Sequence, residues 1–282
     1  MPNSDKQIFK EEQPGKNQFR KQLFIKKRVM KKLENKVAII TGAAGSIGKA
    51  TAALFLEEGA KVMMVDFTHD SLITAMQELN SEHVKYCLAD VSKSADVQNY
   101  VSETVKAFGK IDIFFNNAGI EGAVKPIETY PEESFDEVIS VNVKGAWLGN
   151  KFALPQMNEG GSIIMTSSVS GILGSFNLSG YIASKHAVVG IMRATAIESA
   201  SQKIRVNTVH PGPVNNQFMR SIEEGEVPGR GDEVKKHLEN SIPFRRYAEP
   251  LEVAKLVLFL ASDDSQYITG TTQLIDGGMS AQ

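Results

Sequence analysis

Short apolar runs alternate with amphipathic stretches from residue 36 to the end of the chain. The apolar runs predict strands at residues 37–40, 62–65, 84–89, 111–115, 162–166, 205–209 and 273–275. The stretches between them predict helices at residues 49–58, 71–80, 95–108, 132–157, 181–199 and 251–261. Such alternation, with strands apolar on both faces, is typical of a parallel sheet covered by helices on both sides. We therefore predict one α/β domain with a doubly wound parallel sheet.

Two segments depart from this regular pattern. The long predicted helix at 132–157 has Pro131 and Pro155 as candidate breaks. Residues 213–243 form a long irregular insertion, which we interpret as the lid over a substrate site. The alternative is a solvated helix and loop whose apolar residues only seal it to the domain. The apolar residues expected to cover a substrate are Phe218, Met219 and Ile222 of the insertion, with Leu173 and Phe176 from an earlier loop.

A glycine-rich segment, Thr41 to Gly48, lies between the first strand and the first helix. This is the context of a phosphate-binding turn, in which the pyrophosphate of a dinucleotide lies at the helix N-terminus. Gly42 permits the tight turn, Gly45, Ser46 and Ile47 lie along it, and Gly48 lets helix and strand pack closely. A purely structural turn is the alternative. The segment gives the predicted sheet a Rossmann-type dinucleotide site.

Asp66 ends the second strand, at the position where a carboxylate binds the adenosine ribose. A carboxylate there accepts hydrogen bonds from both ribose hydroxyls of NAD and repels the 2′-phosphate of NADP. No Arg or Lys follows it directly, and none lies within the glycine turn. The sequence therefore favours NAD over NADP. The alternative is that Asp66 is a solvated residue at a strand end and does not contact a cofactor.

Tyr181 and Lys185 are four residues apart in a predicted helix, so both side chains face the same side. A free tyrosine has a pKa of about 10 and is a poor proton carrier at neutral pH. We expect the Lys185 ammonium to lower the pKa of Tyr181 and make it a usable acid/base. Ser168, thirteen residues earlier, supplies a hydroxyl that would hydrogen-bond the same substrate oxygen.

Taken in order, these motifs resemble the short-chain dehydrogenase/reductase family over residues 32–278. Three further groups of residues carry the resemblance: Asp90 and Val91 after the third strand, the Asn-Asn-Ala-Gly run ending at Gly119, and Asn142. Pro211 and Gly212 after the sixth strand, with Ile268-Thr-Gly and Asp276-Gly-Gly near the end, complete it.

The resemblance implies a role for each matching position. Tyr181 would be the general acid/base, Lys185 would bind the nicotinamide ribose, and Ser168 would orient the carbonyl or hydroxyl. Asn142 would support a water-mediated proton path behind Lys185. The remaining positions would contact the cofactor: Asp90 and Val91 at the adenine, Asn117, Ala118 and Gly119 along the cleft, and Pro211, Gly212 and Val214 near the carboxamide.

Two positions depart from the family pattern. The family usually has glycine at position 46, whereas this chain has Gly45 followed by Ser46, whose hydroxyl would still face a phosphate. Family members also often carry threonine where this chain has Asn216. Asparagine can make a similar hydrogen bond to the nicotinamide amide, so we expect Asn216 to contact the cofactor.

Composition and charge add limits to this interpretation. The 282-residue chain has a net charge of −2 and a single cysteine, Cys87, so neither a nucleic-acid partner nor an internal disulfide is expected. No apolar run is long enough to span a membrane. Residues 1–29 hold eight Lys/Arg and three Asp/Glu, and we predict a flexible basic extension before a domain at 30–282. There are two alternatives. Translation could start at Met30, so that residues 1–29 are not made, or residues 19–29 could form an amphipathic helix that binds a partner.

Several other side chains are expected to have structural rather than catalytic roles. His186 and His210 are expected to serve helix packing and a strand end rather than catalysis. Trp147 is expected in the core or a subunit interface, and Glu121 in a solvated loop, although a carboxylate there would also suit a polar substrate. No His or Cys spacing indicates a metal site.

The leading hypothesis is an NAD-dependent oxidoreductase that interconverts a secondary alcohol and a ketone, with Tyr181 as general acid/base. A 3-oxoacyl-(acyl-carrier-protein) reductase is the second hypothesis, disfavoured because such enzymes usually prefer NADPH and have a basic residue in the turn. A non-catalytic NAD-binding regulator is the third. We also expect a cytoplasmic homotetramer, and the sequence leaves the substrate open among cyclic alcohols, sugars, steroids and short hydroxy compounds.

Overall fold

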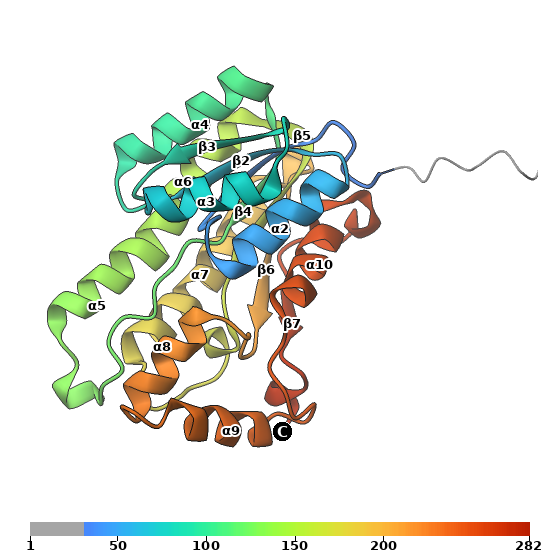
Figure 1. The fold of residues 1–282 in the computed structure, drawn as a ribbon. Helices are drawn as coiled ribbons and strands as arrows, with labels where there is room; N and C mark the ends of the chain where they lie inside the picture. The colour runs from blue at the N-terminus through green and yellow to red at the C-terminus, as the bar shows by residue number, and fades with distance from the viewer. Residues whose placement is uncertain (1–30) are drawn as a thin grey trace, which may run out of the picture. The chain divides into compact units, whose positions relative to one another are not determined.

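A computed structural model describes residues 31–282, and all its helices and strands lie in the unit Lys32–Gln282 (Figure 1). The predicted extension at 1–29 lies outside the described residues. The strands are β1 (Val37–Thr41), β2 (Lys61–Asp66), β3 (Val84–Leu88), β4 (Ile111–Asn116), β5 (Met157–Thr166), β6 (Arg205–Pro211) and β7 (Thr272–Ile275). The helices are α2 (Ser46–Glu57), α3 (His69–Leu79), α4 (Ser94–Phe108), α5 (Glu132–Val138), α6 (Ala146–Ala153), α7 (Ser179–Glu198), α8 (Gln217–Glu226), α9 (Gly231–Ser241) and α10 (Pro250–Ala261).

The strands form one parallel sheet in the order β3-β2-β1-β4-β5-β6-β7. One face packs against α2, α3 and α10 through an apolar cluster that includes Phe55, Leu72 and Val257. The other face packs against α4, α6 and α7 through residues such as Tyr100 and Met192. The predicted doubly wound α/β sheet with helices on both faces is confirmed. Successive strands are added on one side of β1 up to β3 and on its other side from β4 onwards, and this switch point places a crevice at the carboxyl ends of the strands.

The predicted helix at 132–157 is confirmed to within a few residues as one helical stretch, whose hydrogen bonding changes along its length. The chain forms α5, then a π-helical segment Ile139–Gly145, then α6. Pro155 lies in a short 3-10 turn, and β5 already begins at Met157. Hydrophobic spacing did not reveal the π-helical segment, because that segment keeps a helical pattern of apolar residues while its backbone hydrogen bonds shift.

The insertion at 213–243 is more regular than predicted, because it contains α8 and α9.

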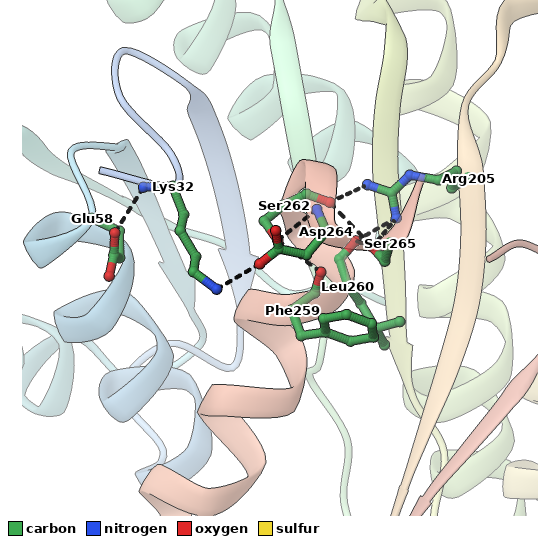
Figure 2. Close-up of polar contacts among 8 residues, drawn as sticks. All are labelled: Lys32, Glu58, Arg205, Phe259, Leu260, Ser262, Asp264 and Ser265. Carbon is green, nitrogen blue, oxygen red and sulfur yellow. Dashed lines mark hydrogen bonds and ion pairs between the residues drawn. The ribbon is translucent and has the colours of Figure 1, made fainter. Parts of the chain in front are cut away.

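A buried arginine holds the end of α10 against the sheet (Figure 2). Arg205, the first residue of β6, is 6% exposed and donates hydrogen bonds to Leu260 O (2.6 Å), Ser262 O (3.2 Å) and Ser265 Oγ (2.7 Å). Burial lowers the pKa of the guanidinium, and the charge of Asp263 opposes this shift. A cation at a helix C-terminus satisfies carbonyls that have no partner within the helix.

Replacing Arg205 with methionine is expected to lower the free energy of unfolding by about 2–4 kcal/mol, because hydrogen bonds from a charged donor, each worth about 1.5–3 kcal/mol, are lost, while Leu260 O and Ser262 O keep serine donors. The control is Arg193→Met on the exposed side of α7, for which a change within about 0.5 kcal/mol is expected. Urea unfolding measures both. Equal stability of the two variants would show that the Arg205 contacts do not hold the fold.

Within residues 31–282, no helix combines the length and the apolar character needed to cross a bilayer.

Candidate active site

A cavity of about 1460 Å³ opens along the carboxyl ends of the strands. All the residues predicted for catalysis or cofactor binding line it except Asn142, which lies behind its wall. Those that line it are Gly42, Gly45, Ser46, Ile47, Gly48, Asp66, Asp90, Val91, Asn117, Ala118, Gly119, Ser168, Tyr181, Lys185, Pro211, Gly212, Val214 and Asn216. Segments far apart in sequence therefore meet in one hollow.

The glycine turn connects β1 to α2 and leaves no space for side chains at two positions. Gly42 has φ +63°, and a Cβ there would lie 3.0 Å from Ala118 Cα. A Cβ at Gly48 would lie 2.2 Å from Gly42 O. Helix α2 begins at Ser46 without a side-chain cap, so its first N–H groups can bind an anion. The turn therefore fits a dinucleotide pyrophosphate.

Asp66 fixes the turn and also faces the cavity. One carboxylate oxygen accepts a hydrogen bond from Ala44 N (2.9 Å), and the other accepts from Phe67 N (2.8 Å) and Thr68 N (3.3 Å). These backbone bonds hold the carboxylate at the end of β2, beside the first helix. Asp66 thus has a structural role in addition to the ribose contact predicted for it.

Asp90 lies at the edge of the cavity after β3 and belongs to a tight turn. Although burial opposes the shift, hydrogen bonds from the Ser92 hydroxyl (2.6 Å) and Ser92 N (2.9 Å) hold the pKa of Asp90 below its usual value. The adjacent Val91 packs close to Gly145, where a Cβ would lie 2.9 Å from the valine side chain. This packing fixes Val91 in the cavity wall.

Asn117 links the ends of three strands. Its amide nitrogen lies 3.1 Å from Thr41 O and 3.3 Å from Gly42 O, and its amide oxygen accepts from Thr166 Oγ1 at 2.9 Å. Two positions later, a Cβ on Gly119 would lie 3.2 Å from Lys185 Nζ. The Asn-Ala-Gly run therefore joins β1, β4 and β5 while leaving space beside the lysine.

Asn142 belongs to the π-helical segment, and its side-chain amide forms three hydrogen bonds. Its amide oxygen accepts from Ile120 N (2.8 Å), and its nitrogen donates to Ile120 O (2.8 Å) and Ser184 Oγ (3.0 Å). These bonds connect the loop after β4 to α7. Lys185 Nζ donates instead to Thr166 O at 2.9 Å, so the proton path behind Lys185 stays a prediction.

Ser168, Tyr181 and Lys185 meet on one side of the cavity. Lys185 Nζ lies 5.5 Å from the centre of the Tyr181 ring. Burial raises the pKa of Tyr181 to about 12; a hydrogen bond with Ser168 opposes this rise, and the charge of Glu121 adds to it. Burial also lowers the pKa of Lys185 to about 8. The predicted lowering of the Tyr181 pKa is therefore not seen in this structure, where removal of the phenol from water is the largest effect on that pKa.

The buried ammonium makes stability depend on pH. Since the pKa of Lys185 is about 8 in the fold against 10.5 for a free lysine, the unfolded chain binds the extra proton between these values. Burial of Lys185 therefore costs stability below pH 8, and this cost falls as the pH rises towards 10.5. Lys185→Met should therefore raise the free energy of unfolding by about 2 kcal/mol at pH 7. This figure allows for the loss of the hydrogen bond to Thr166 O. Urea titrations at several pH values measure this gain, and a gain that does not shrink above pH 8 would contradict the argument.

The nicotinamide end of the predicted site is built by the loop after β6. A Cβ at Gly212 would lie 2.9 Å from Asp276 Cα, so the Pro-Gly pair and the C-terminal Asp-Gly-Gly run pack together. Asn216 caps α8, and its side-chain oxygen accepts from Met219 N at 2.9 Å. The side-chain N–H groups of Asn216 are therefore left to make the contact with the cofactor that the family pattern predicts.

The predicted lid residues line the cavity beside Tyr181, and the ring of Phe218 lies 5.7 Å from that of Tyr181.

Trp147 is 49% exposed, so its assignment to the core is wrong; an interface role stays a prediction. Sequence reasoning missed the contacts of His210, which is fully buried against Ser168. Across the described part of the chain, no cluster of three or more His, Cys, Asp or Glu is placed to hold a metal ion.

Comparison with known proteins identifies this arrangement. A family model described as enoyl-(acyl carrier protein) reductase matches residues 42–280. Levodione reductase of Leifsonia aquatica is 39% identical over 88% of this chain and 95% of its own length. Cyclohexanol dehydrogenase of Acinetobacter is 35% identical over 92% of this chain and its full length. 3-Oxoacyl-(acyl-carrier-protein) reductase of Thermotoga maritima is 38% identical over 88% of this chain and 99% of its own length.

Two solved structures extend the similarity to three dimensions. The crystal structure of levodione reductase has a TM-score of 0.85 at 39% identity, over 88% of this chain and 99% of that one. The structure of NAD+-bound xylitol dehydrogenase has a TM-score of 0.84 at 34% identity, over 88% of this chain and all of that one. Fold and site thus define an oxidoreductase with a nicotinamide cofactor. The chain belongs to the short-chain dehydrogenase/reductase family and acts on alcohol or ketone groups.

Proposed function

We propose that the protein is an NAD-dependent dehydrogenase for compact, largely apolar secondary alcohols or the matching ketones. One observation carries the proposal: Ser168, Tyr181 and Lys185 lie in the same cavity as the glycine turn and Asp66. The apolar side chains next to Tyr181 favour a ring-shaped hydrocarbon body over a sugar. The names of two relatives, levodione reductase and cyclohexanol dehydrogenase, support a cyclic substrate.

The chain's residues would manage the proton in this reaction. The bound nicotinamide would supply the site that accepts or donates hydride. In the reduction direction, Tyr181 donates its proton to the carbonyl oxygen, and Ser168 hydrogen-bonds the same oxygen. The raised pKa of Tyr181 keeps this proton in place until the substrate is bound. The Lys185 ammonium beside the resulting phenolate offsets part of the cost of burying an anion. Oxidation runs the same steps in reverse, with Tyr181 accepting the proton of the substrate hydroxyl.

The first experiment measures reduced nicotinamide by absorbance, with NAD or NADP and a panel of cyclic, linear, sugar and steroid alcohols and ketones. Turnover of cyclic compounds with NAD is expected. Turnover confined to acyl thioesters with NADPH would favour the second candidate, a 3-oxoacyl-(acyl-carrier-protein) reductase. The absence of a basic side chain at Ala44 and Gly45 argues against that candidate. Cofactor binding without turnover of any compound would favour a non-catalytic regulator.

The choice of NAD is attributed to Asp66. Asp66→Ala should narrow the NAD-to-NADP ratio of kcat/KM by about tenfold or more, because a hydrogen bond to a charged group contributes about 1.5–3 kcal/mol. Asp66→Asn keeps the shape and removes the charge, so it separates repulsion of the 2′-phosphate from loss of backbone support at Ala44. Asp70→Ala, at an exposed carboxylate early in α3, is the matched control. An unchanged ratio in both Asp66 variants would rule out Asp66 as the selector.

A cytoplasmic homotetramer completes the proposal. Apolar side chains exposed on α5, α6 and the C-terminal segment support the assembly, among them Phe135, Trp147, Tyr267 and Leu274. Light scattering after size-exclusion chromatography tests the assembly, and a monomer at micromolar concentration would contradict it. Cell fractionation tests the compartment.

A further inference from the structure

His210 is a buried imidazole next to the catalytic residues that the proposed mechanism does not use. It lies near the end of β6, is fully buried, and does not line the cavity. A buried ring that contacts neither substrate nor cofactor can act only through its neighbours.

The two ring nitrogens of His210 have different partners. Nδ1 lies 2.7 Å from the main-chain oxygen of Ser168, and Nε2 lies 2.8 Å from Thr208 Oγ1. Because a carbonyl oxygen can only accept, Nδ1 carries the proton. Burial lowers the pKa of His210; the bond to Ser168 opposes this shift, and the nearby Lys185 ammonium adds to it. The ring is therefore neutral, and its Nε2 accepts from the Thr208 hydroxyl.

The hydrogen bond from His210 reaches the main chain of Ser168, and the position of Ser168 sets where its hydroxyl points. Ser168 begins the short turn Val169–Gly171; its carbonyl accepts from Gly171 N (2.8 Å) and its hydroxyl from Ser170 N (3.1 Å). Gly171 packs closely there, since a Cβ would lie 2.2 Å from Ser167 Oγ and 3.3 Å from His210 Cε1. The ring and the turn form one packed unit, so loss of the ring's hydrogen bond is transmitted to the Ser168 hydroxyl.

We propose that His210 is a positioning residue: its Nδ1–H fixes the main chain at Ser168 and thereby directs the Ser168 hydroxyl to the reacting oxygen. This inference rests on the proposed function for its effect on turnover. Thr208 holds the ring in the required tautomer.

Two substitutions separate hydrogen bonding from packing. His210→Asn keeps an N–H donor at the same number of bonds from Cα as Nδ1, whereas His210→Leu fills similar space without a donor. We expect His210→Leu to lower kcat by about tenfold or more at unchanged KM for NAD, since misplacement of about 1 Å can cost about 10²-fold. His210→Asn should stay within about threefold of the original enzyme, because it keeps the bond. If only packing matters, the leucine variant will be the more active one, and the proposal is overturned.

A second measurement does not depend on turnover. Nitrogen NMR of the labelled protein should show His210 neutral with its proton on Nδ1 at pH 7, and exchange of the Ser170 and Gly171 amides should speed up in His210→Leu but not in His210→Asn. A proton on Nε2, a charged ring, or equal exchange in both variants would overturn the proposal. Absence of turnover in the original protein, with these NMR results intact, would instead count against the proposed function.

Discussion

Tyr181→Phe is expected to lower kcat by about 10³-fold while leaving the cofactor affinity unchanged, because acid/base catalysis contributes about 10²–10⁴-fold. The substitution removes only the hydroxyl that carries the proton. The ring keeps its place on α7 beside Phe218, and the glycine turn is untouched. Steady-state kinetics and fluorescence titration with NAD measure the two quantities.

Tyr130→Phe is the matched control for this experiment. The hydroxyl of Tyr130 is buried and has no hydrogen-bond partner among the described residues, and Tyr130 does not line the cavity. Its removal should leave kcat within about twofold, as expected for a surface or unpaired group without catalytic contact. Loss of turnover in both variants would indicate general damage, and retained turnover in Tyr181→Phe would remove Tyr181 from the mechanism.

Gly48→Ala is expected to weaken NAD binding by about 100-fold, equivalent to about 3 kcal/mol of strain in the turn. The added Cβ would lie 2.2 Å from Gly42 O and 2.7 Å from Ala43 Cα, so the backbone must move where the pyrophosphate would bind. Isothermal titration with NAD measures the affinity, and thermal unfolding measures the cost to the fold.

The same turn supplies the control. A Cβ on Gly45 would meet Gly42 O at 3.3 Å, and Gly45 has φ −69°, which any residue adopts. Gly45→Ala should therefore weaken binding by about fivefold at most, since alanine is a poorer helix N-cap than glycine by about 0.5–1 kcal/mol. Equal losses in both variants would mean that added bulk anywhere in the turn is harmful and that Gly48 is not special.

The doubly wound sheet and the grouping of the site residues could be anticipated from the sequence, because parallel strands place their carboxyl ends on one edge. Local periodicity could not reveal the π-helical turn around Asn142, since the apolar spacing there is still helical. It also could not show that Asp66 bonds Ala44 N, or that His210 bonds Ser168 O, because both contacts join segments that only the folded sheet brings together. The pKa of Tyr181 was mispredicted for the same reason: burial is a property of the assembled core.

The cavity is built from the ends of strands that lie far apart along the chain. Parallel pairing of such strands requires slow, long-range loop closure. A newly synthesised chain therefore lacks a complete cofactor site until β6 has joined the sheet, and the nicotinamide cofactor binds only the folded protein. Cofactor at 100 times its dissociation constant would add about 2.7 kcal/mol of stability. Cells starved of nicotinamide would accordingly retain less of this protein, because proteases remove unfolded chains first.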